Sequence, residues 1–302
     1  MAEQVVMSSR ARGPVPPWGL AVAAMMSVQL GSALSVGLIG SIGPAGTAWL
    51  RLSMGALIFM LLARPPLRRV RRRDVPVLLG LGIMTGLMTV GFLAALEYIP
   101  LGTAVAIEFL GPLTVAAVRS RSSRALIWPI VALGGVVLLT EPWRGEVNPV
   151  GILFAGLAAI GWALYIVLSQ RVGDRFSGIS SLSLTIPIAA VTAAVVGIPQ
   201  AAGHLSLEVI AAAAGLALLL PVLPFALEML ALRRMTATAF GTLMALEPAI
   251  GLFLGLIVLR QQPSPVQLLG ILLVVVAGAA AQRGSRRSTQ HSPTARPADF
   301  PG

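Results

Sequence analysis

The sequence predicts an all-α integral membrane protein with ten transmembrane helices arranged as two inverted five-helix repeats. Of its 302 residues, 56% are hydrophobic and only 11% are charged. In a water-soluble domain, about a quarter of the residues are charged. The mean hydropathy of +0.88 is also far above that of such a domain. Lipid is therefore the expected solvent for most of the chain.

Apolar runs of about 18 to 23 residues, cut at charges or at Pro and Gly clusters, mark the expected spans. Arg10 and Arg12 precede the first run, as in a signal peptide. That run exceeds the roughly 7 to 15 apolar residues of a signal peptide, so we interpret it as an uncleaved helix. In order, the spans are 17–39, 45–63, 75–97, 101–118, 125–140, 150–170, 179–198, 209–231, 236–258 and 265–281.

The basic residues, 22 in number and all arginine, predict the orientation. With the N-terminus in the cytoplasm, nineteen fall in cytoplasmic segments, whereas Arg144 and Arg260 fall in outer loops and Arg51 falls within a span. This bias supports ten spans with both termini in the cytoplasm. The same bias explains the net charge of +11, because the positive residues gather in cytoplasmic segments. A basic protein could also bind nucleic acid, but the chain lacks the motifs of that class.

An internal similarity predicts the domain organisation. Segments 95–112 and 231–248 resemble each other at an offset of 136 residues. Because five helices per half is an odd number, the second half must enter from the opposite face, and inverted repeats are a transporter architecture with a site near the midplane. We expect a cytoplasmic N-terminus at 1–16, a first repeat at 17–141, an external linker at 142–149, a second repeat at 150–281 and a disordered cytoplasmic tail at 282–302.

Ionisable residues within the spans are candidates for function because lipid penalises them. Arg51 and Glu108 lie at similar depths, so they could form a resting pair or hold the carboxylate and ammonium groups of a zwitterion. Glu247 is central in its span, which favours a functional role. Glu228 and Glu97 lie nearer helix ends, where a salt bridge or a contact with water is the simpler explanation.

Aromatic residues and helix breakers lie near these charges. Trp162 and Tyr165 share a helix face and either line a cavity or pack against another helix. The prolines remove backbone donors beside the carboxylate faces, for which a kink between packed helices is an equally good explanation. The candidate helix-break or gating residues are Gly111, Pro112, Pro221, Pro224 and Pro248.

The sequence gives no sign of an enzyme. Its two histidines, His204 and His291, fall in an outer loop and in the tail, and it has no cysteine. It also lacks zinc-protease, paired-aspartate and phosphate-binding glycine motifs. We therefore expect no cofactor and no metal, and any transport would be driven by an ion or substrate gradient.

Three segments resemble the signatures of a known family: IPLGTAVAIEFLGP at 99–112, LPFALEM at 223–229 and FGTLMALEP at 240–248. They are similar to bacterial threonine/homoserine exporters of the EamA group in the drug/metabolite transporter superfamily, and the resemblance covers about residues 17–281. It implies the five-plus-five inverted repeat in the bacterial inner membrane and export of small amino acids with the proton gradient. By position, it makes Glu108, Glu228 and Glu247 the family's acidic residues.

The leading hypothesis is a proton antiporter that works by alternating access. Its substrate-binding residues would be Arg51, Glu108, Trp162 and Tyr165. Glu247 would carry the coupling proton, and Glu228 is the second proton-coupling candidate. The expected partners are a small amino acid, protons and membrane lipid. One alternative is broad drug or metabolite efflux, in which the glutamates would attract cations. The arginine-rich second cytoplasmic loop and the long tail depart from the family pattern. Another alternative is a membrane receptor or scaffold without transport.

Overall fold

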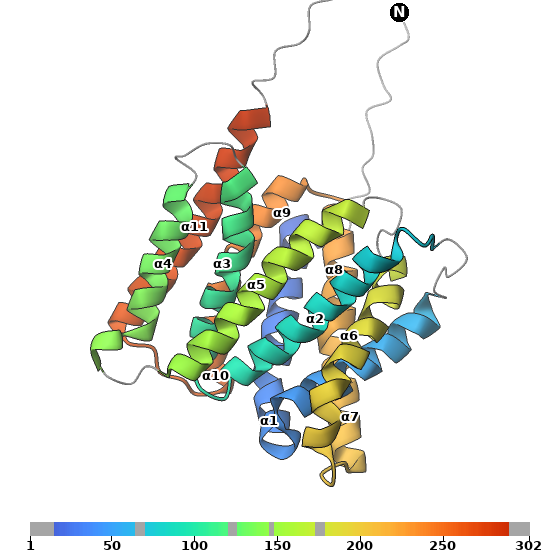
Figure 1. Ribbon diagram of the computed structural model, residues 1–302. Coiled ribbons are helices and arrows are strands. Elements are labelled where there is room, and N and C mark those ends of the chain that lie inside the picture. Colours follow the sequence, from blue (N-terminus) through green and yellow to red (C-terminus); the bar gives the residue numbers. More distant parts are fainter. Residues whose placement is uncertain (1–14, 64–69, 120–125, 145–147, 173–178, 290–302) are drawn as a thin grey trace, which may run out of the picture.

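The computed structural model describes residues 15–63, 70–119, 126–144, 148–172 and 179–289, and all regular structure in these ranges is helical. Figure 1 shows the helices gathered into one bundle. The elements are α1 (Pro17–Leu62), α2 (Val75–Ala95), α3 (Leu101–Arg119), α4 (Ile127–Thr140), η3 (Pro142–Arg144), α5 (Pro149–Val172), α6 (Ile179–Ala201), α7 (Leu207–Ala217), η5 (Leu218–Val222), α8 (Leu223–Leu232), α9 (Ala237–Met244), α10 (Glu247–Val258) and α11 (Pro265–Thr289).

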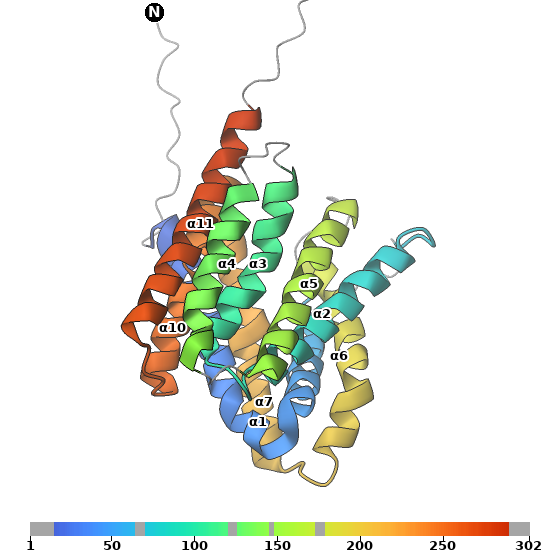
Figure 2. The same cartoon turned by 60° about the vertical axis from the view of Figure 1, so that its left-hand side comes forward.

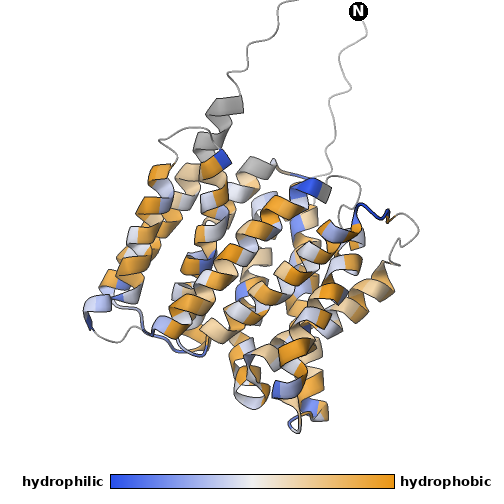
Figure 3. Ribbon diagram, in the orientation of Figure 1, coloured by the Kyte–Doolittle hydropathy of each residue, from blue (hydrophilic) through white to orange (hydrophobic). Residues whose placement is uncertain are grey.

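In the described part of the chain, seven helical segments are long and apolar enough to cross a membrane, and a shorter apolar helix covers Pro265–Ala281. Large apolar side chains lie on the outer surface, where Leu61 is 84% exposed and Leu207 is 82% exposed. Figure 3 shows hydrophobic residues along the helices, with the most hydrophilic residues mainly at helix ends and connections. The predicted class, an all-α integral membrane protein, is therefore confirmed, whereas the count of ten crossings stays a prediction.

The first two predicted spans form one 46-residue helix, α1, which is interrupted at Gly43. Gly43 has φ 73° and ψ 169°, a backbone conformation that glycine adopts without the steric cost of a side chain. The side-chain oxygen of Gln200 on α6 accepts hydrogen bonds from the backbone N–H groups of Ala45 and Gly46, at 2.7 and 3.0 Å. It thereby caps the N-terminal end of the second leg of α1, the part after Gly43. The part before Gly43 is the first leg.

A second interruption separates α7 from α8, within a stretch predicted as one span at 209–231. There η5 is a π-helical turn, and Leu220 has the non-helical angles φ −158° and ψ 110°. Pro221 lies in the same turn and has no backbone N–H to donate. Ser27 on the first leg donates to the carbonyl oxygen of Leu219 at 2.7 Å. The side chain of α1 thus satisfies a carbonyl group at the break, as apolar surroundings require.

Two further predicted boundaries differ from the structure. The span at 236–258 consists of α9 and α10, with a turn between Met244 and Glu247. Pro248 lies in the first turn of α10, where its missing N–H leaves no helical bond unmade. Helix α11 continues to Thr289, past the predicted end at 281 and into the segment for which composition predicts disorder.

Neighbouring helices pack closely around the centre of the bundle. Helix α1 packs against α6, α2 against both α5 and α6, α3 against α5 and α10, and α4 against α11. Figure 2 shows α4 and α11 side by side, away from α2 and α6. A Cβ atom at Gly82 would lie 2.9 Å from the carbonyl oxygen of Thr185, and one at Gly86 would lie 2.8 Å from that of Ala189. These glycines therefore allow α2 and α6 to approach closely.

Candidate functional site

A cavity of about 330 Å³ lies at the centre of the bundle. Helices α1, α2, α3, α5, α6, α8 and α10 line it, together with η5 and the end of α9. Its volume is at the lower end of the range of about 300 to 1,000 Å³ that is usual for small-molecule sites. The interrupted helices described above therefore meet at a space large enough for a small solute.

Eight of the residues predicted from the sequence line this cavity. They come from five separate parts of the chain, so the fold brings together residues that the sequence keeps far apart. The eight are Arg51, Glu108, Trp162, Tyr165, Pro221, Pro224, Glu228 and Glu247.

Arg51 comes from the second leg of α1 and is only 4% exposed. Its Nη1 atom donates a hydrogen bond to the Oγ atom of Ser35 on the first leg, at 3.1 Å. The Ser35 hydroxyl in turn donates to the carbonyl oxygen of Gly31 at 2.6 Å. Because that hydrogen is committed to Gly31, the Ser35 oxygen accepts from Arg51, and the two legs hold the guanidinium at the cavity wall.

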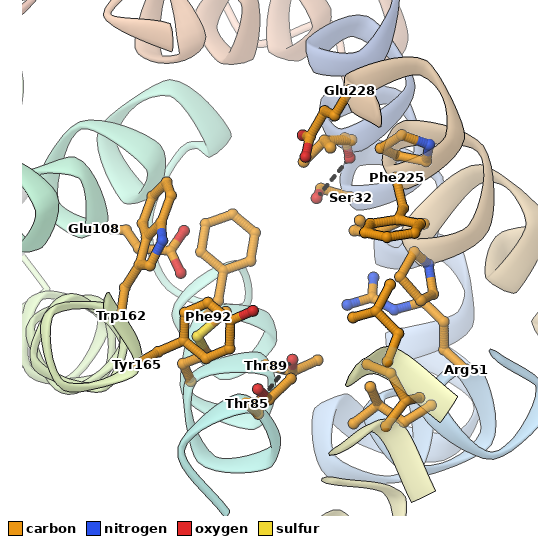
Figure 4. A pocket seen from close by; sticks show the side chains of 18 of the residues that line it. Ser32, Arg51, Thr85, Thr89, Phe92, Glu108, Trp162, Tyr165, Phe225 and Glu228 are labelled. Carbon is orange, nitrogen blue, oxygen red and sulfur yellow. Dashed lines mark hydrogen bonds between the residues drawn. The ribbon is translucent and has the colours of Figure 1, made fainter. Parts of the chain in front are cut away.

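Glu108 lies on the wall opposite Arg51. Figure 4 shows the carboxyl group of Glu108 beside Trp162, and Arg51 across the open space. The two charges are near enough to attract each other, but within the described ranges neither belongs to an ion pair at 4.0 Å or less. The two residues therefore line one cavity, with space between the groups in place of a closed pair.

Trp162 and Tyr165 reach the cavity from α5, on the same side as Glu108 (Figure 4). The phenylalanine on the facing side, Phe225 of α8, is held by an edge-to-face contact with Phe59 at a centroid distance of 6.0 Å. Aromatic rings at such positions give a small ligand apolar surface beside the charged groups. Of the two interpretations offered by the sequence, the structure favours cavity lining for Trp162 and Tyr165.

Two more carboxyl groups face the same space. Glu247 begins α10 and is 5% exposed, and Glu228 on α8 is half-buried. The charge of Glu247 lies within electrostatic range of both Glu228 and Glu108. No ion pair holds Glu228 in the described part of the chain. Arg234, which follows the end of α8, donates to the carbonyl oxygen of Val15 at 3.4 Å. The interfacial salt bridge is therefore not formed.

The other predicted breakers lie outside the cavity lining. A Cβ atom at Gly111 would overlap the carbonyl oxygen of Ala159, so this glycine serves the close contact between α3 and α5. Pro112 lies within α3, which remains one helix from Leu101 to Arg119. Pro248 is buried in the first turn of α10. A close helix contact explains Gly111, and a gating role for all three positions stays a prediction.

Sequence reasoning missed several polar residues of the lining. Thr85 and Thr89 face the cavity from α2, Thr185 from α6, and Gln29 and Ser32 from the first leg of α1. The signal available was weak: the two α2 threonines are spaced by one helical turn, and Gln29 interrupts an apolar run. Gln29 is 3% exposed, and its Oε1 atom accepts no hydrogen bond in the described structure.

A cavity with charged and aromatic side chains, enclosed by interrupted apolar helices, defines a multi-pass membrane transporter. The model of the EamA-like transporter family matches residues 149–280. The chain is 33% identical over 91% of its length to the threonine/homoserine exporter RhtA of Escherichia coli K12, of which it covers 94%. It is 34% identical over 88% of its length to RhtA of Salmonella typhimurium LT2, of which it covers 91%. The chain therefore belongs to the EamA-like transporter family of the drug/metabolite transporter superfamily.

Weaker similarities agree with this assignment. The uncharacterized transporter YvbV of Bacillus subtilis is 27% identical over 48% of this chain and 50% of its own length. One protein of known crystal structure shares the fold, with a TM-score of 0.59 over 89% of this chain and 98% of the other at 20% identity. The named relatives are transporters, which confirms that the chain is not an enzyme.

Proposed function

We propose that this chain is a proton-coupled exporter of small hydroxylated amino acids, of which threonine and homoserine are the model substrates, in the bacterial inner membrane. The names of the relatives that align with most of the chain support the substrate class. The observation that carries the proposal is the cavity itself, in which the guanidinium of Arg51 and the carboxyl group of Glu108 face each other without a closed ion pair.

In this proposal a zwitterion inserts between the two groups. Arg51 binds the substrate carboxylate, because a guanidinium presents paired donors that match the two carboxylate oxygens. Glu108 accepts from the ammonium group on the opposite wall. Trp162 and Tyr165 cover the apolar part of the substrate from α5. Arg51 and Glu108 would make these contacts only when a substrate lies between them. Without a substrate, the two charged groups lie apart from each other.

Charge balance supports coupling to protons. Three carboxyl groups, those of Glu108, Glu228 and Glu247, share the cavity with one guanidinium. A zwitterion carries no net charge, so its arrival does not neutralise the excess of acidic groups. Protonation of Glu228 and Glu247 would neutralise this excess of acidic groups. The free-energy cost would be low, because the apolar surroundings disfavour unpaired charge. Release of those protons and release of the substrate would then occur in alternate states of one site.

The ten-helix arrangement belongs to the same proposal, with five helices in residues 17–141 and five in 150–281. At 1.5 Å per residue, α1 is about 69 Å long, roughly twice the bilayer core, and its interruption at Gly43 allows two crossings. In Figure 1 the bend of α1 and the α2–α3 and α6–α7 connections lie at the lower edge, whereas the start of α1 and the α8–α9 connection lie at the upper edge. This alternation is what repeated crossing requires, with the upper edge as the cytoplasmic side.

Alternating access would use the interrupted helices. The π-helical turn with Pro221, and Pro224 one turn further on, lie at the cavity wall, where a change of helix direction opens or closes the space. Gly111, Pro112 and Pro248 would act as secondary hinges between packed helices. Both termini and the tail would remain in the cytoplasm.

Transport by purified protein in proteoliposomes tests the proposal. Labelled threonine on the side corresponding to the cytoplasm should cross the membrane faster when the opposite side is acidified, and threonine and homoserine should compete. Glu247→Gln should retain threonine exchange while losing the acceleration by the pH gradient. The matched control is Glu97→Gln, an exposed carboxyl group in the turn after α2, which should behave as wild type. Threonine flux that ignores the pH gradient in the wild type would refute proton coupling.

Broad efflux of organic cations is the second candidate. It is favoured by the adaptable apolar part of the lining, which includes Met88, Phe92 and Met244 beside the aromatic residues already named. Competition by bulky amines together with a failure of amino acids to compete would select this function over amino-acid export.

A further inference from the structure

Three threonines line one side of the cavity, and none of them takes part in the charged contacts proposed above. Thr85 and Thr89 lie one turn apart on α2, and Thr185 lies on α6. The close approach of α2 and α6 at Gly82 and Gly86 brings the two helices together there. We call these three residues the hydroxyl wall. Figure 4 shows Thr85 and Thr89 at the edge of the space that separates Arg51 from Glu108.

Each hydroxyl of this wall has already used its hydrogen. Thr85 Oγ1 donates to the carbonyl oxygen of Leu81 at 2.8 Å, and Thr89 Oγ1 donates to that of Thr85 at 2.7 Å. Thr185 Oγ1 donates to the carbonyl oxygen of Ser181 at 3.0 Å. A hydroxyl has one hydrogen and two lone pairs, so all three present only acceptor lone pairs to a ligand.

An acceptor-only wall constrains the ligand. A substrate carboxylate has no hydrogen to give and is repelled there, which directs it to Arg51. An ammonium group has a stronger acceptor available in the carboxyl group of Glu108. What remains for the wall is a neutral donor on the substrate side chain, and a hydroxyl is the smallest such group.

We propose that the hydroxyl wall reads the side-chain hydroxyl of the substrate and so makes this transporter selective for hydroxylated amino acids over apolar ones of the same shape. This inference rests on the proposed function. Thr85, Thr89 and Thr185 are the specificity-determining residues, and none of them holds the amino-acid head groups.

Threonine and valine provide the test, because they differ by a hydroxyl in place of a methyl group. A neutral hydrogen bond, with the cost of leaving a buried partner unpaired, separates such a pair by roughly tenfold. In proteoliposomes preloaded with threonine, wild-type uptake of labelled threonine should exceed that of labelled valine by about this factor. The ratio is taken within one protein sample, so it does not depend on how much protein is inserted.

The variants are Thr85→Val, Thr89→Val and Thr185→Val, singly and combined, since valine has the shape of threonine without its hydroxyl. The matched control is Thr192→Val on α6. Its hydroxyl also bonds a carbonyl one turn earlier, that of Ile188 at 2.9 Å, but it packs beside Gly86 and does not line the cavity. The cavity variants should bring the threonine-to-valine ratio towards one, mainly through loss of threonine uptake, and the control should keep the wild-type ratio.

Several results would overturn the inference. An unchanged ratio in the combined variant would do so, and so would an equal loss of threonine and valine uptake, which would assign the hydroxyls to the ammonium group. A wild-type protein that takes up valine as well as threonine would overturn it without any variant. If the wild type moves neither homoserine nor threonine, the proposed function itself fails, and that outcome is separate from a failure of selectivity.

Discussion

The hydrogen bond between Arg51 and Ser35 leads to the most specific prediction. Ser35 is fully buried, does not line the cavity, and accepts from Arg51 Nη1 at 3.1 Å. Replacement by alanine removes the acceptor and leaves one guanidinium N–H without its partner. Ser35→Ala should therefore weaken binding of the substrate carboxylate by disordering Arg51, although Ser35 itself touches no substrate.

The size of the effect follows from the geometry. A hydrogen bond to a charged group is worth about 1.5 to 3 kcal/mol, and Ser35 holds only one of the five guanidinium donors. We take the lower end, about 1.5 kcal/mol, which corresponds to roughly a tenfold rise in the KM for threonine. The maximal rate of transport should change little, because the groups that bind the substrate in each transport cycle are the same in Ser35→Ala as in the wild type.

Proteoliposome uptake with two competitors separates this effect from general damage. Threonine should compete about tenfold less well in Ser35→Ala than in the wild type. The amine 1-amino-2-propanol, which is threonine without its carboxylate, should compete equally well in both proteins. Ser183→Ala is the control, because Ser183 is 2% exposed and donates to the carbonyl oxygen of Ser180 at 3.1 Å without a charged partner. Equal weakening of threonine and of the amine would refute a role for Ser35 through Arg51.

Three further predictions concern the interruption of α1 at Gly43 and the carboxyl group of Glu108. Gln200→Leu should destabilise the protein by about 2 kcal/mol, because two backbone hydrogen bonds are lost. Its melting temperature in detergent should fall, whereas Gln262→Leu, at an exposed loop position, should leave it unchanged. Gly43→Ala should lower it further, since the new Cβ atom overlaps the Gln200 side chain at a φ of 73°. Glu108→Gln should raise the KM for threonine at least tenfold in proteoliposomes, and wild-type affinity would contradict an ammonium contact.

Much of the charged site could be predicted from the sequence, because lipid makes a buried charge costly and therefore conspicuous. This cost identifies Arg51, Glu108 and Glu247 as candidates, and all three line one cavity. The position of each residue within its predicted span also places Arg51 and Glu108 at similar depths in the membrane. The sequence left open whether they form a closed pair, since that depends on the position of α1 relative to α3.

The hydroxyl wall could not be predicted in this way. A threonine in an apolar helix is common, because its hydroxyl can bond to its own backbone, and nothing in the sequence tells which helix face it occupies. Only the packing of α2 on α6 identifies Thr85 and Thr185 as parts of one surface. Gly111 illustrates the opposite case: its place beside a carboxylate indicated function, but its contact with α5 shows a packing role.

The interruptions of the helices were only partly predictable. The predicted boundary between the first two spans, at residues 39–45, coincides with the interruption of α1 at Gly43. The partner that caps the bend, Gln200, lies more than 150 residues away in the sequence, so it emerges only from the fold. The same holds for Ser27, which bonds the carbonyl group of Leu219 at the break between α7 and α8.

The zero-flux condition in proteoliposomes tests the coupling of amino acid and proton most directly. At each of several fixed pH gradients, the threonine gradient is varied until net threonine movement stops. A proton-coupled exporter predicts that this balance point shifts with the pH gradient, and that Glu247→Gln abolishes the shift while threonine exchange continues. A balance point that stays at equal threonine concentrations, whatever the pH gradient, would contradict proton-coupled export through this cavity.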